Sequence, residues 1–335
     1  MDHAAGHTAA QLAAGRDDGS DGPDGRTPDR PFAERLHARV EATGSVVCLG
    51  VDPRPERHPS THPERHDGDA AKVARAVAAY FRELITAAAE HLACVKVQSA
   101  FFERLGIPGL IAMAQVLADV RELGLPVDAK RGDIGSTAEA YADAYLAAGV
   151  FAADALTVQP YLGMDAIEPF VAAAERGHRG VFVLVRTSNP GGADLQDLAL
   201  AHAGTGAVTV ADRLADLLTE RARELGVDAR GYGPLGAVVG GTVPGRLAEL
   251  RQRLPHAPLL VPGYGAQGAG PAEVTAAVEA RADGEVTAAF DPDGLGAIVS
   301  ASRSLTYLDG DDPPAEAARA AAAMKRDLRA AIDAR

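Results

Sequence analysis

The sequence predicts a single-domain α/β protein of the (β/α)8, or TIM-barrel, class. Two observations lead to this prediction. After residue 31, short apolar runs alternate with longer amphipathic stretches, and there are eight such runs. Strands that are apolar on both faces and are each followed by a helix form parallel sheets. Eight of them favour a closed barrel, because an open doubly wound sheet more often has five or six strands.

The expected strands are short segments rich in Val, Leu, Ile and Ala. They are residues 45–50, 93–97, 125–129, 153–158, 180–185, 235–239, 258–262 and 296–300. Amphipathic helical stretches separate the strands, for example residues 70–92 and 137–149, and residues 313–335 are expected to add a final helix.

The first thirty residues differ in composition from the rest of the chain. Residues 1–30 are rich in Asp, Gly and Pro and contain almost no large apolar side chain. Such a segment cannot bury enough apolar surface to offset the entropy lost on ordering, so it is expected to be a disordered tail. Residues 31–335 are then expected to form the barrel domain.

Charge and hydropathy exclude several functional classes. The net charge of -13 opposes nucleic-acid binding, which requires clustered positive charge. No stretch approaches the roughly 18 to 20 apolar residues of a membrane-spanning helix, and the N-terminus lacks the pattern of a secretory signal. Cys48 and Cys94 lie in apolar runs and are expected to be buried free thiols. We therefore expect a soluble protein of the reducing cytoplasm.

The lysines are few and their positions are informative. Only four of the 33 basic residues are lysines: Lys72, Lys96, Lys130 and Lys325. A chain so biased toward Arg is expected to use Arg wherever a surface charge suffices. Lys96 and Lys130 belong to apolar strands, which suggests that those positions need a compact ammonium that can give up a proton.

Charged residues stand at the ends of the first three expected strands, where barrel enzymes place their chemistry. Asp52 follows the first strand and Lys96 lies near the end of the second. The third strand runs into residues 128–133 (DAKRGD), in which Asp128 and Lys130 are two apart and so share one face. The competing interpretation is an ion-pair network that only joins strands, but such networks are a poor route to stability. Asp52 precedes a proline and by itself fits an ordinary turn equally well.

Residues 128–137 (DAKRGDIGST) resemble the D-x-K-x-x-D-I-x-x-T signature of the orotidine 5'-phosphate decarboxylase family. Residues 95–98 (VKVQ), the pair Phe102 and Glu103, and residues 157–170 (TVQPYLGMDAIEPF) resemble the bacterial subgroup with longer loops. The resemblance extends from about residue 32 to residue 307. A bare D-x-K-x-x-D is less specific, because related sugar-phosphate barrels share it.

The resemblance implies decarboxylation of orotidine 5'-phosphate to uridine 5'-phosphate (UMP), the last step of de novo UMP synthesis. Lys130 would protonate C6 of the pyrimidine as carbon dioxide leaves, and Asp128 would lie beside the substrate carboxylate. Lys96 and Asp133 would complete an array of alternating charge. Asp133 and Thr137 would reach into the partner's site, which implies an obligate homodimer. These roles require no metal and no organic cofactor.

The loops after the last two strands are where barrels of this class commonly bind phosphate. Residues 263–268 (GYGAQG) follow the seventh strand and Arg303 follows the eighth. The glycines match G-x-G-x-x-G, but a dinucleotide site would place that motif in the first βα turn of its domain. The family resemblance implies that Gln267 and Arg303 bind the 5'-phosphate, with Gly265 in the same loop.

The fifth expected strand leads into a polar loop, residues 186–192 (RTSNPGG). It resembles the loop that recognises the pyrimidine in this family, with Ser188 bonding the base and Asn189 beside it. An inert turn is the alternative, although loops at this end of a barrel commonly carry function.

Two other functions remain open on the sequence alone. One is a sugar-phosphate decarboxylase or aldolase of the same superfamily, which would need a divalent metal. The other is a nucleotide-binding barrel without catalysis. His58, His62 and His66 are spaced as on one helix face, but the prolines among them forbid that helix, so no metal site is expected there.

Overall fold

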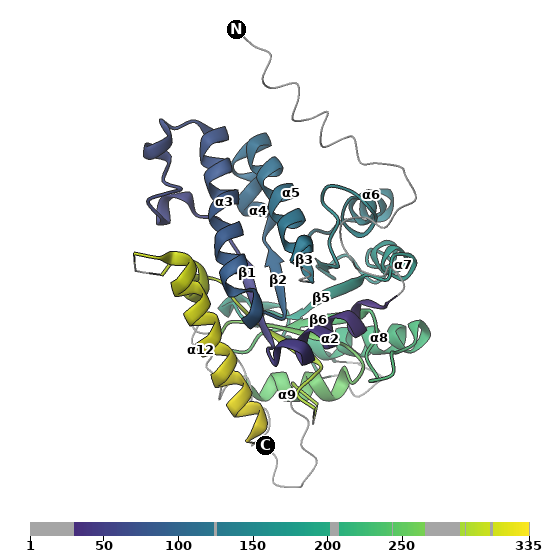
Figure 1. Ribbon diagram of the computed structural model, residues 1–335. Coiled ribbons are helices and arrows are strands. Elements are labelled where there is room, and N and C mark those ends of the chain that lie inside the picture. The colour runs from purple at the N-terminus through teal and green to yellow at the C-terminus, as the bar shows by residue number, and fades with distance from the viewer. Residues whose placement is uncertain are drawn as a thin grey trace.

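The computed structural model describes residues 30–123, 126–201, 208–242, 244–264, 289–291, 293–308 and 311–334. Eight parallel strands close into a barrel in chain order (Figure 1). They are β1 (Val47–Val51), β2 (Cys94–Val97), β3 (Val127–Lys130), β4 (Ala155–Val158), β5 (Gly180–Arg186), β6 (Leu235–Val239), β7 (Leu259–Pro262) and β8 (Ala297–Ala301). Each overlaps an expected strand and differs from it by at most two residues at either end. The predicted (β/α)8 barrel is therefore confirmed.

Helices surround the barrel. They are α2 (Phe32–Thr43), α3 (Ala70–Ala88), α4 (Ser99–Glu103), α5 (Gly106–Glu122), α6 (Gly135–Leu146), α7 (Glu168–Arg176), α8 (Val210–Leu225), α9 (Pro244–Arg253), α11 (Arg303–Thr306) and α12 (Pro313–Asp333). Short 3-10 turns lie at Pro55–Arg57, Pro63–His66, Ala89–His91 and Pro190–Asp194. The final helix α12 packs along α3 and also contacts β1 and α11.

Helix starts follow the local sequence. The Asp69 side chain accepts the backbone N–H groups of Ala71 and Lys72 at 2.8 and 3.1 Å, which caps α3. Thr209 and Asp212 form a capping box at the start of α8. Each cap satisfies N–H groups that have no partner inside the helix.

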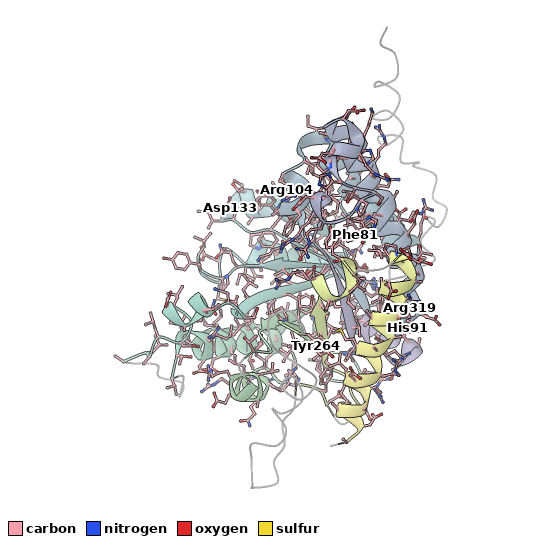
Figure 2. All side chains as sticks on the ribbon, turned by 90° about the vertical axis from the view of Figure 1, so that its left-hand side faces the viewer. Phe81, His91, Arg104, Asp133, Tyr264 and Arg319 are labelled. Carbon is pink, nitrogen blue, oxygen red and sulfur yellow. The ribbon has the colours of Figure 1, made fainter. Side chains whose placement is uncertain are left out.

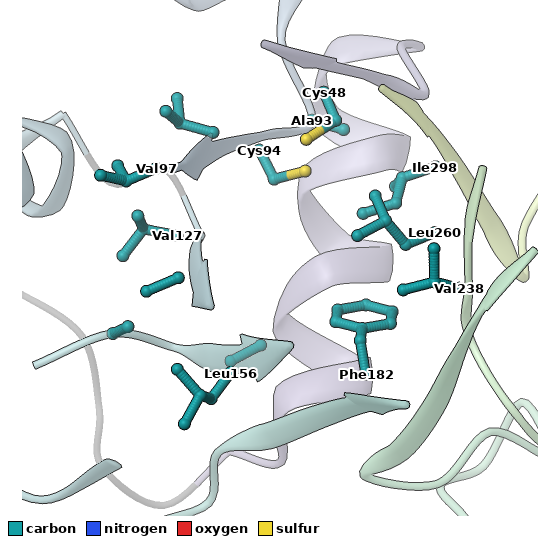
Figure 3. Close-up of a cluster of buried hydrophobic side chains, with 14 of the residues drawn as sticks. Cys48, Ala93, Cys94, Val97, Val127, Leu156, Phe182, Val238, Leu260 and Ile298 are labelled. Carbon is teal, nitrogen blue, oxygen red and sulfur yellow. The ribbon is translucent and has the colours of Figure 1, made fainter. Parts of the chain in front are cut away.

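Aliphatic side chains, two cysteines and one aromatic ring fill the barrel interior below its mouth, which is the end that carries the carboxyl termini of the strands. Figure 3 shows Cys48 and Cys94 in one cluster of buried side chains with Leu260, Val238 and Phe182. Both cysteines are buried free thiols, as expected. The Phe182 ring occupies space that Gly236 leaves open, because a Cβ on that glycine would lie 2.7 Å from the ring. This layer separates the mouth of the barrel from its foot.

Helix α2 closes the foot of the barrel, which is the end that carries the amino termini of the strands. Phe32 packs edge-on against Phe182, with ring centroids 5.8 Å apart. Close by, the fully buried Asp154 side chain accepts hydrogen bonds from Arg35 and Arg179 and from the backbone N–H of Val127, the last at 3.0 Å. These contacts join α2 to the start of β3 and β4.

Residues 1–29 of the expected tail lie outside the described residues. Within the part of the chain that the structure describes, no helix has both the length and the apolar character needed to cross a membrane.

Candidate active site

Strand register brings four chemically important side chains to the same side of the sheet. Lys96 on β2 is the register partner of Asp128 on β3, and Lys130 on β3 is the partner of Thr157 on β4. Asp128 and Lys130 are two residues apart, so their side chains point the same way. All four therefore face the barrel interior, near the carboxyl ends of the strands.

Lys96, Asp128 and Thr157 form a closed triangle of hydrogen bonds. The Lys96 ammonium donates to Asp128 Oδ2 and, at 3.1 Å, to Thr157 Oγ1. Thr157 Oγ1 lies 2.8 and 3.0 Å from the two Asp128 carboxylate oxygens. The carboxylate is thus held from two directions. Sequence reasoning missed Thr157, although a hydroxyl inside the apolar run at residues 153–158 was a usable signal.

Lys130 is the cation outside this triangle. Among the residues that the structure describes, none forms a hydrogen bond or ion pair with its ammonium group. Burial lowers the pKa of Lys130, and the neighbouring positive charge of Lys96 lowers it further, while Asp128 acts in the opposite direction. An ammonium with a weakened hold on its proton is suited to proton donation.

Asp128 has the complementary electrostatics. Burial raises the pKa of its carboxyl group, and the Lys96 ammonium, the Thr157 hydroxyl and Lys130 oppose that rise. The net direction is upward, so desolvation outweighs the three groups that favour the ionised carboxylate.

A cavity of about 530 Å³ opens above these groups. Lys96, Lys130 and Thr157 line one side of it, and Leu184 and Val238 are among its apolar lining. Asp128 does not line the cavity itself but lies beneath Lys96, to which it is bonded. The volume suits a ligand of nucleotide size, within the usual range of small-molecule sites.

The ends of β7 and β8 form another side of the same cavity. Gly263 and Tyr264 line it after β7, and Ser302 and Arg303 line it after β8. The hydroxyls of Ser302, which lines the cavity, and of Ser304, which does not, are buried without a hydrogen-bond partner among the described residues. Such donors without a partner, beside an arginine, suit an anionic group. The predicted Gly265 and Gln267 lie outside the described residues.

Other predicted groups converge on this cavity from β1 and β5. Asp52, Ser188 and Asn189 all line it. The loop carrying Ser188 lies close to the backbone after β6, because a Cβ on Gly240 would lie 2.8 Å from Ser188 backbone atoms. Arg186 points elsewhere, and its guanidinium binds both carboxylate oxygens of Asp197 at 2.9 Å. Arg54, which was not predicted, also lines the cavity.

All of the cavity residues described above lie within the segment of the chain that matches a known family. The chain matches the family described as orotidine 5'-phosphate decarboxylase / HUMPS over residues 45–319. The chain belongs to this family. The family recognised from the DAKRGDIGST segment is therefore confirmed.

Individual members of the family are similar over most of the chain. An orotidine 5'-phosphate decarboxylase of Rhodopirellula baltica is 46% identical over 82% of this chain and 88% of its own length. One of Deinococcus radiodurans is 41% identical over 90% of this chain and 98% of its own length. The solved structure of Leishmania donovani OMP decarboxylase is 29% identical with a TM-score of 0.68, and the match covers 90% of this chain and 98% of that chain.

Two residues of the orotidine 5'-phosphate decarboxylase signature lie outside the cavity of this chain. Asp133 is half-buried and accepts the backbone N–H of Ile134 at 2.8 Å, and Thr137 is exposed on α6. Neither lines the cavity, and Figure 2 shows Asp133 toward the edge of the molecule. A single chain therefore does not bring them to Lys130.

Arg131, inside the same decarboxylase signature, also points away from the cavity. Its guanidinium binds Ser99 and Glu103 and lies 5.2 Å above the Tyr145 ring. It joins β3 to α4 and α6, so its part in this site is structural.

The described residues contain no group of three or more His, Cys, Asp or Glu side chains placed to hold a metal ion. His58 and His66 instead bond to Ser60, through its hydroxyl at 2.7 Å and its carbonyl at 2.8 Å. The histidines after β1 thus organise their own loop.

Proposed function

We propose that this protein decarboxylates orotidine 5'-phosphate to UMP and carbon dioxide, with Lys130 as the proton donor. The observation that supports this most is an ammonium group that has no partner among the described residues, next to a carboxylate that is already bound by Lys96 and Thr157. Family membership and the printed names of the relatives support the reaction itself.

The proposed step needs only a positioned charge and a proton. The bond between C6 and the carboxylate breaks, and its electron pair remains on C6 while carbon dioxide departs. The Lys130 ammonium stabilises that negative charge and then transfers a proton to C6, which gives UMP. Lys130 regains its proton from solvent, so atoms and charge balance without any cofactor.

Asp128 has a separate part in the proposal. Held by Lys96 and Thr157, it would lie beside the substrate carboxylate, and this like-charge contact disappears as carbon dioxide leaves. Its bonds to two donors oppose the effect of burial on its ionisation and fix the carboxylate in place.

The remaining cavity residues would bind the rest of the nucleotide. Arg303, with Gly265 and Gln267 from the sequence that follows β7, would hold the 5'-phosphate, since an arginine fork suits a phosphate group. Ser188 and Asn189 would bond the pyrimidine, and Asp52 a polar group between base and phosphate.

We also propose that residues 31–335 act as one catalytic domain and that two copies form the working enzyme. Asp133 and Thr137 would complete the partner's site. Apolar side chains in the loops after β3 and β4 are exposed, with Ile134 at 53% and Tyr161 at 77%. Exposed apolar patches mark protein–protein interaction sites, and an interface between two copies would cover these side chains.

A mixing experiment tests the shared site. Lys130→Met and Asp133→Ala are each expected to be inactive alone. If Asp133 acts across the interface, a mixed dimer contains one intact site, and an equal mixture recovers about a quarter of the wild-type activity, the value for random pairing of two equivalent subunits. No recovery, in mixtures shown to exchange subunits, would contradict this part of the proposal.

The reaction is tested by the change in pyrimidine absorbance when purified protein meets orotidine 5'-phosphate in the presence of a chelator. We expect full conversion that is insensitive to the chelator. Conversion that needs an added divalent metal would favour the sugar-phosphate alternative. Binding of UMP without turnover would indicate a nucleotide-binding barrel and would refute the proposal.

A further inference from the structure

The hydroxyl of Thr157 takes part in no bond-breaking or proton-transfer step of the mechanism proposed above, yet it contacts two of the groups that mechanism uses. It lies on β4, whose other residues are Ala155, Leu156 and Val158, and it is 1% exposed. A buried hydroxyl is unfavourable unless it is hydrogen-bonded. Its bonds go to Lys96 and Asp128.

The direction of these bonds follows from the number of protons available. The Lys96 ammonium can only donate, so it uses a lone pair of Thr157 Oγ1, 3.1 Å away. The single hydroxyl proton is then left for the Asp128 carboxylate, whose oxygens are 2.8 and 3.0 Å distant. A chain of this kind, in which each bond polarises the next, strengthens its members.

We infer that Thr157 is a positioning residue for the decarboxylation, and that its hydroxyl fixes the orientation of the Asp128 carboxylate between Lys96 and Lys130. Register supports this role, because Thr157 is the partner of Lys130 and lines the same cavity. Its branched side chain has few rotamers, so the hydroxyl is held in one place. The inference rests on the proposed function, since it assigns Thr157 a part in that same site.

The charged surroundings of Asp128 make the effect of Thr157 measurable. Lys96 and the buried Cys94 face Asp128 from β2, and Lys130 lies on its own strand. Thr157, from β4, contributes a hydrogen bond that favours the ionised carboxylate. Removing that bond raises the pKa of Asp128, so activity that needs the carboxylate should fall at a higher pH as the solution is acidified.

The test compares Thr157→Val, which keeps the shape and removes the hydroxyl, with Thr157→Ser, which keeps the hydroxyl. Thr219→Val is the matched control, because Thr219 is also buried and its hydroxyl bonds the Arg253 carbonyl at 2.6 Å, a contact between α8 and α9 outside the cavity lining. Each variant is assayed for kcat, KM and the pH profile of kcat/KM, and its folding is checked by circular dichroism. Thr157→Ala replaces Thr157→Val if the latter does not fold.

Thr157→Val is expected to lower kcat about ten- to a hundredfold, as for loss of one hydrogen bond to a charged group, while KM changes much less. Its acid limb should move to higher pH, and Thr157→Ser should retain most of the activity. The inference is overturned if Thr157→Val keeps the wild-type kcat and acid limb, or if Thr157→Ser is as impaired as Thr157→Val. A wild-type protein that does not convert orotidine 5'-phosphate would instead refute the proposed function.

Discussion

The mouth and the foot of the barrel each bury one carboxylate next to two cations, and they pair them differently. At the foot, Asp154 Oδ1 accepts from both Arg35 and Arg179. At the mouth, Lys96 is the one ion-pair partner of Asp128 among the residues that the structure describes, and Lys130 lies beside the pair without forming a bond to it. The foot uses its charges to join elements, whereas the mouth keeps one charge available.

The cations at the two ends also differ in residue type, since the foot uses arginines and the mouth uses lysines. Arginine cannot release its proton near neutral pH and presents several fixed donors, which suits a permanent junction. Lysine is compact and can transfer a proton when its surroundings lower its pKa, as burial and Lys96 do for Lys130. The comparison predicts that changes at the mouth affect catalysis and that changes at the foot affect stability.

The largest expected effect is that of Lys130→Met on turnover. Loss of both the proton donor and its charge should reduce kcat by more than about a thousandfold. UMP binding should persist, because Arg303 and the other phosphate-side groups remain. Steady-state kinetics and calorimetric titration with UMP measure the two quantities separately.

The same variant should not be less stable than the wild type. The pKa of Lys130 is lowered in the folded state, so the folded protein binds fewer protons there than the unfolded chain. Lys130 then opposes folding below its folded pKa, and that penalty is relieved as pH rises through it. A clear drop in the urea midpoint of Lys130→Met at neutral pH would show that Lys130 belongs to a stabilising network.

At the foot, Asp154→Ala should lower the stability of the protein and leave catalysis nearly unchanged. It leaves Arg35, Arg179 and the Val127 N–H without their shared acceptor, and breaking a buried pair in this way costs about 3–5 kcal/mol. The kcat of the remaining folded enzyme should be close to that of the wild type. Glu224→Ala is the control, because Glu224 lies within helix α8, its side chain is 71% exposed, and its bridge to Arg221 should contribute less than about 1 kcal/mol.

Arg303→Ala should weaken binding without removing the chemistry. We expect KM to rise about a hundredfold, for loss of a charged donor pair to phosphate, with a smaller change in kcat. Competition by UMP and by uridine provides the control. An equal loss of affinity for UMP and for uridine would mean that Arg303 does not recognise the phosphate.

The smallest effect expected is a shift of the alkaline limb of kcat/KM. Lys130 must be protonated to act, so activity should fall as pH rises through its lowered pKa, that is, below the ordinary lysine value of 10.5. An alkaline limb at or above that value would indicate that Lys130 does not carry the essential proton.

The sequence was sufficient to predict the barrel because its strands are buried on both faces and read as continuous apolar runs. It was also sufficient to predict that Lys96 and Lys130 line one cavity, because the carboxyl ends of neighbouring parallel strands converge. The spacing of two between Asp128 and Lys130 places both side chains on the same face of β3. The positions of Asp52, Ser188, Asn189 and Arg303 at that cavity follow from the same convergence.

Other features depend on relations that one sequence does not encode locally. The bond between Thr157 and Asp128 requires the register of β3 against β4. The outward turn of Arg131 depends on acceptors supplied by α4 and on the Tyr145 ring of α6. Asp133 and Thr137 remain predictions, because a single chain cannot show what they contact in a dimer.

Chemical rescue of Lys130→Cys tests the central claim, that the ammonium at this position is the group that acts. Alkylation with 2-bromoethylamine rebuilds an ammonium on the cysteine, whereas iodoacetamide adds a neutral group of similar size. The wild type, whose Cys48 and Cys94 are buried, is treated in parallel. The account predicts that decarboxylation of orotidine 5'-phosphate returns only with the ammonium. Equal activity in the neutral derivative, or in untreated Lys130→Cys, would contradict it.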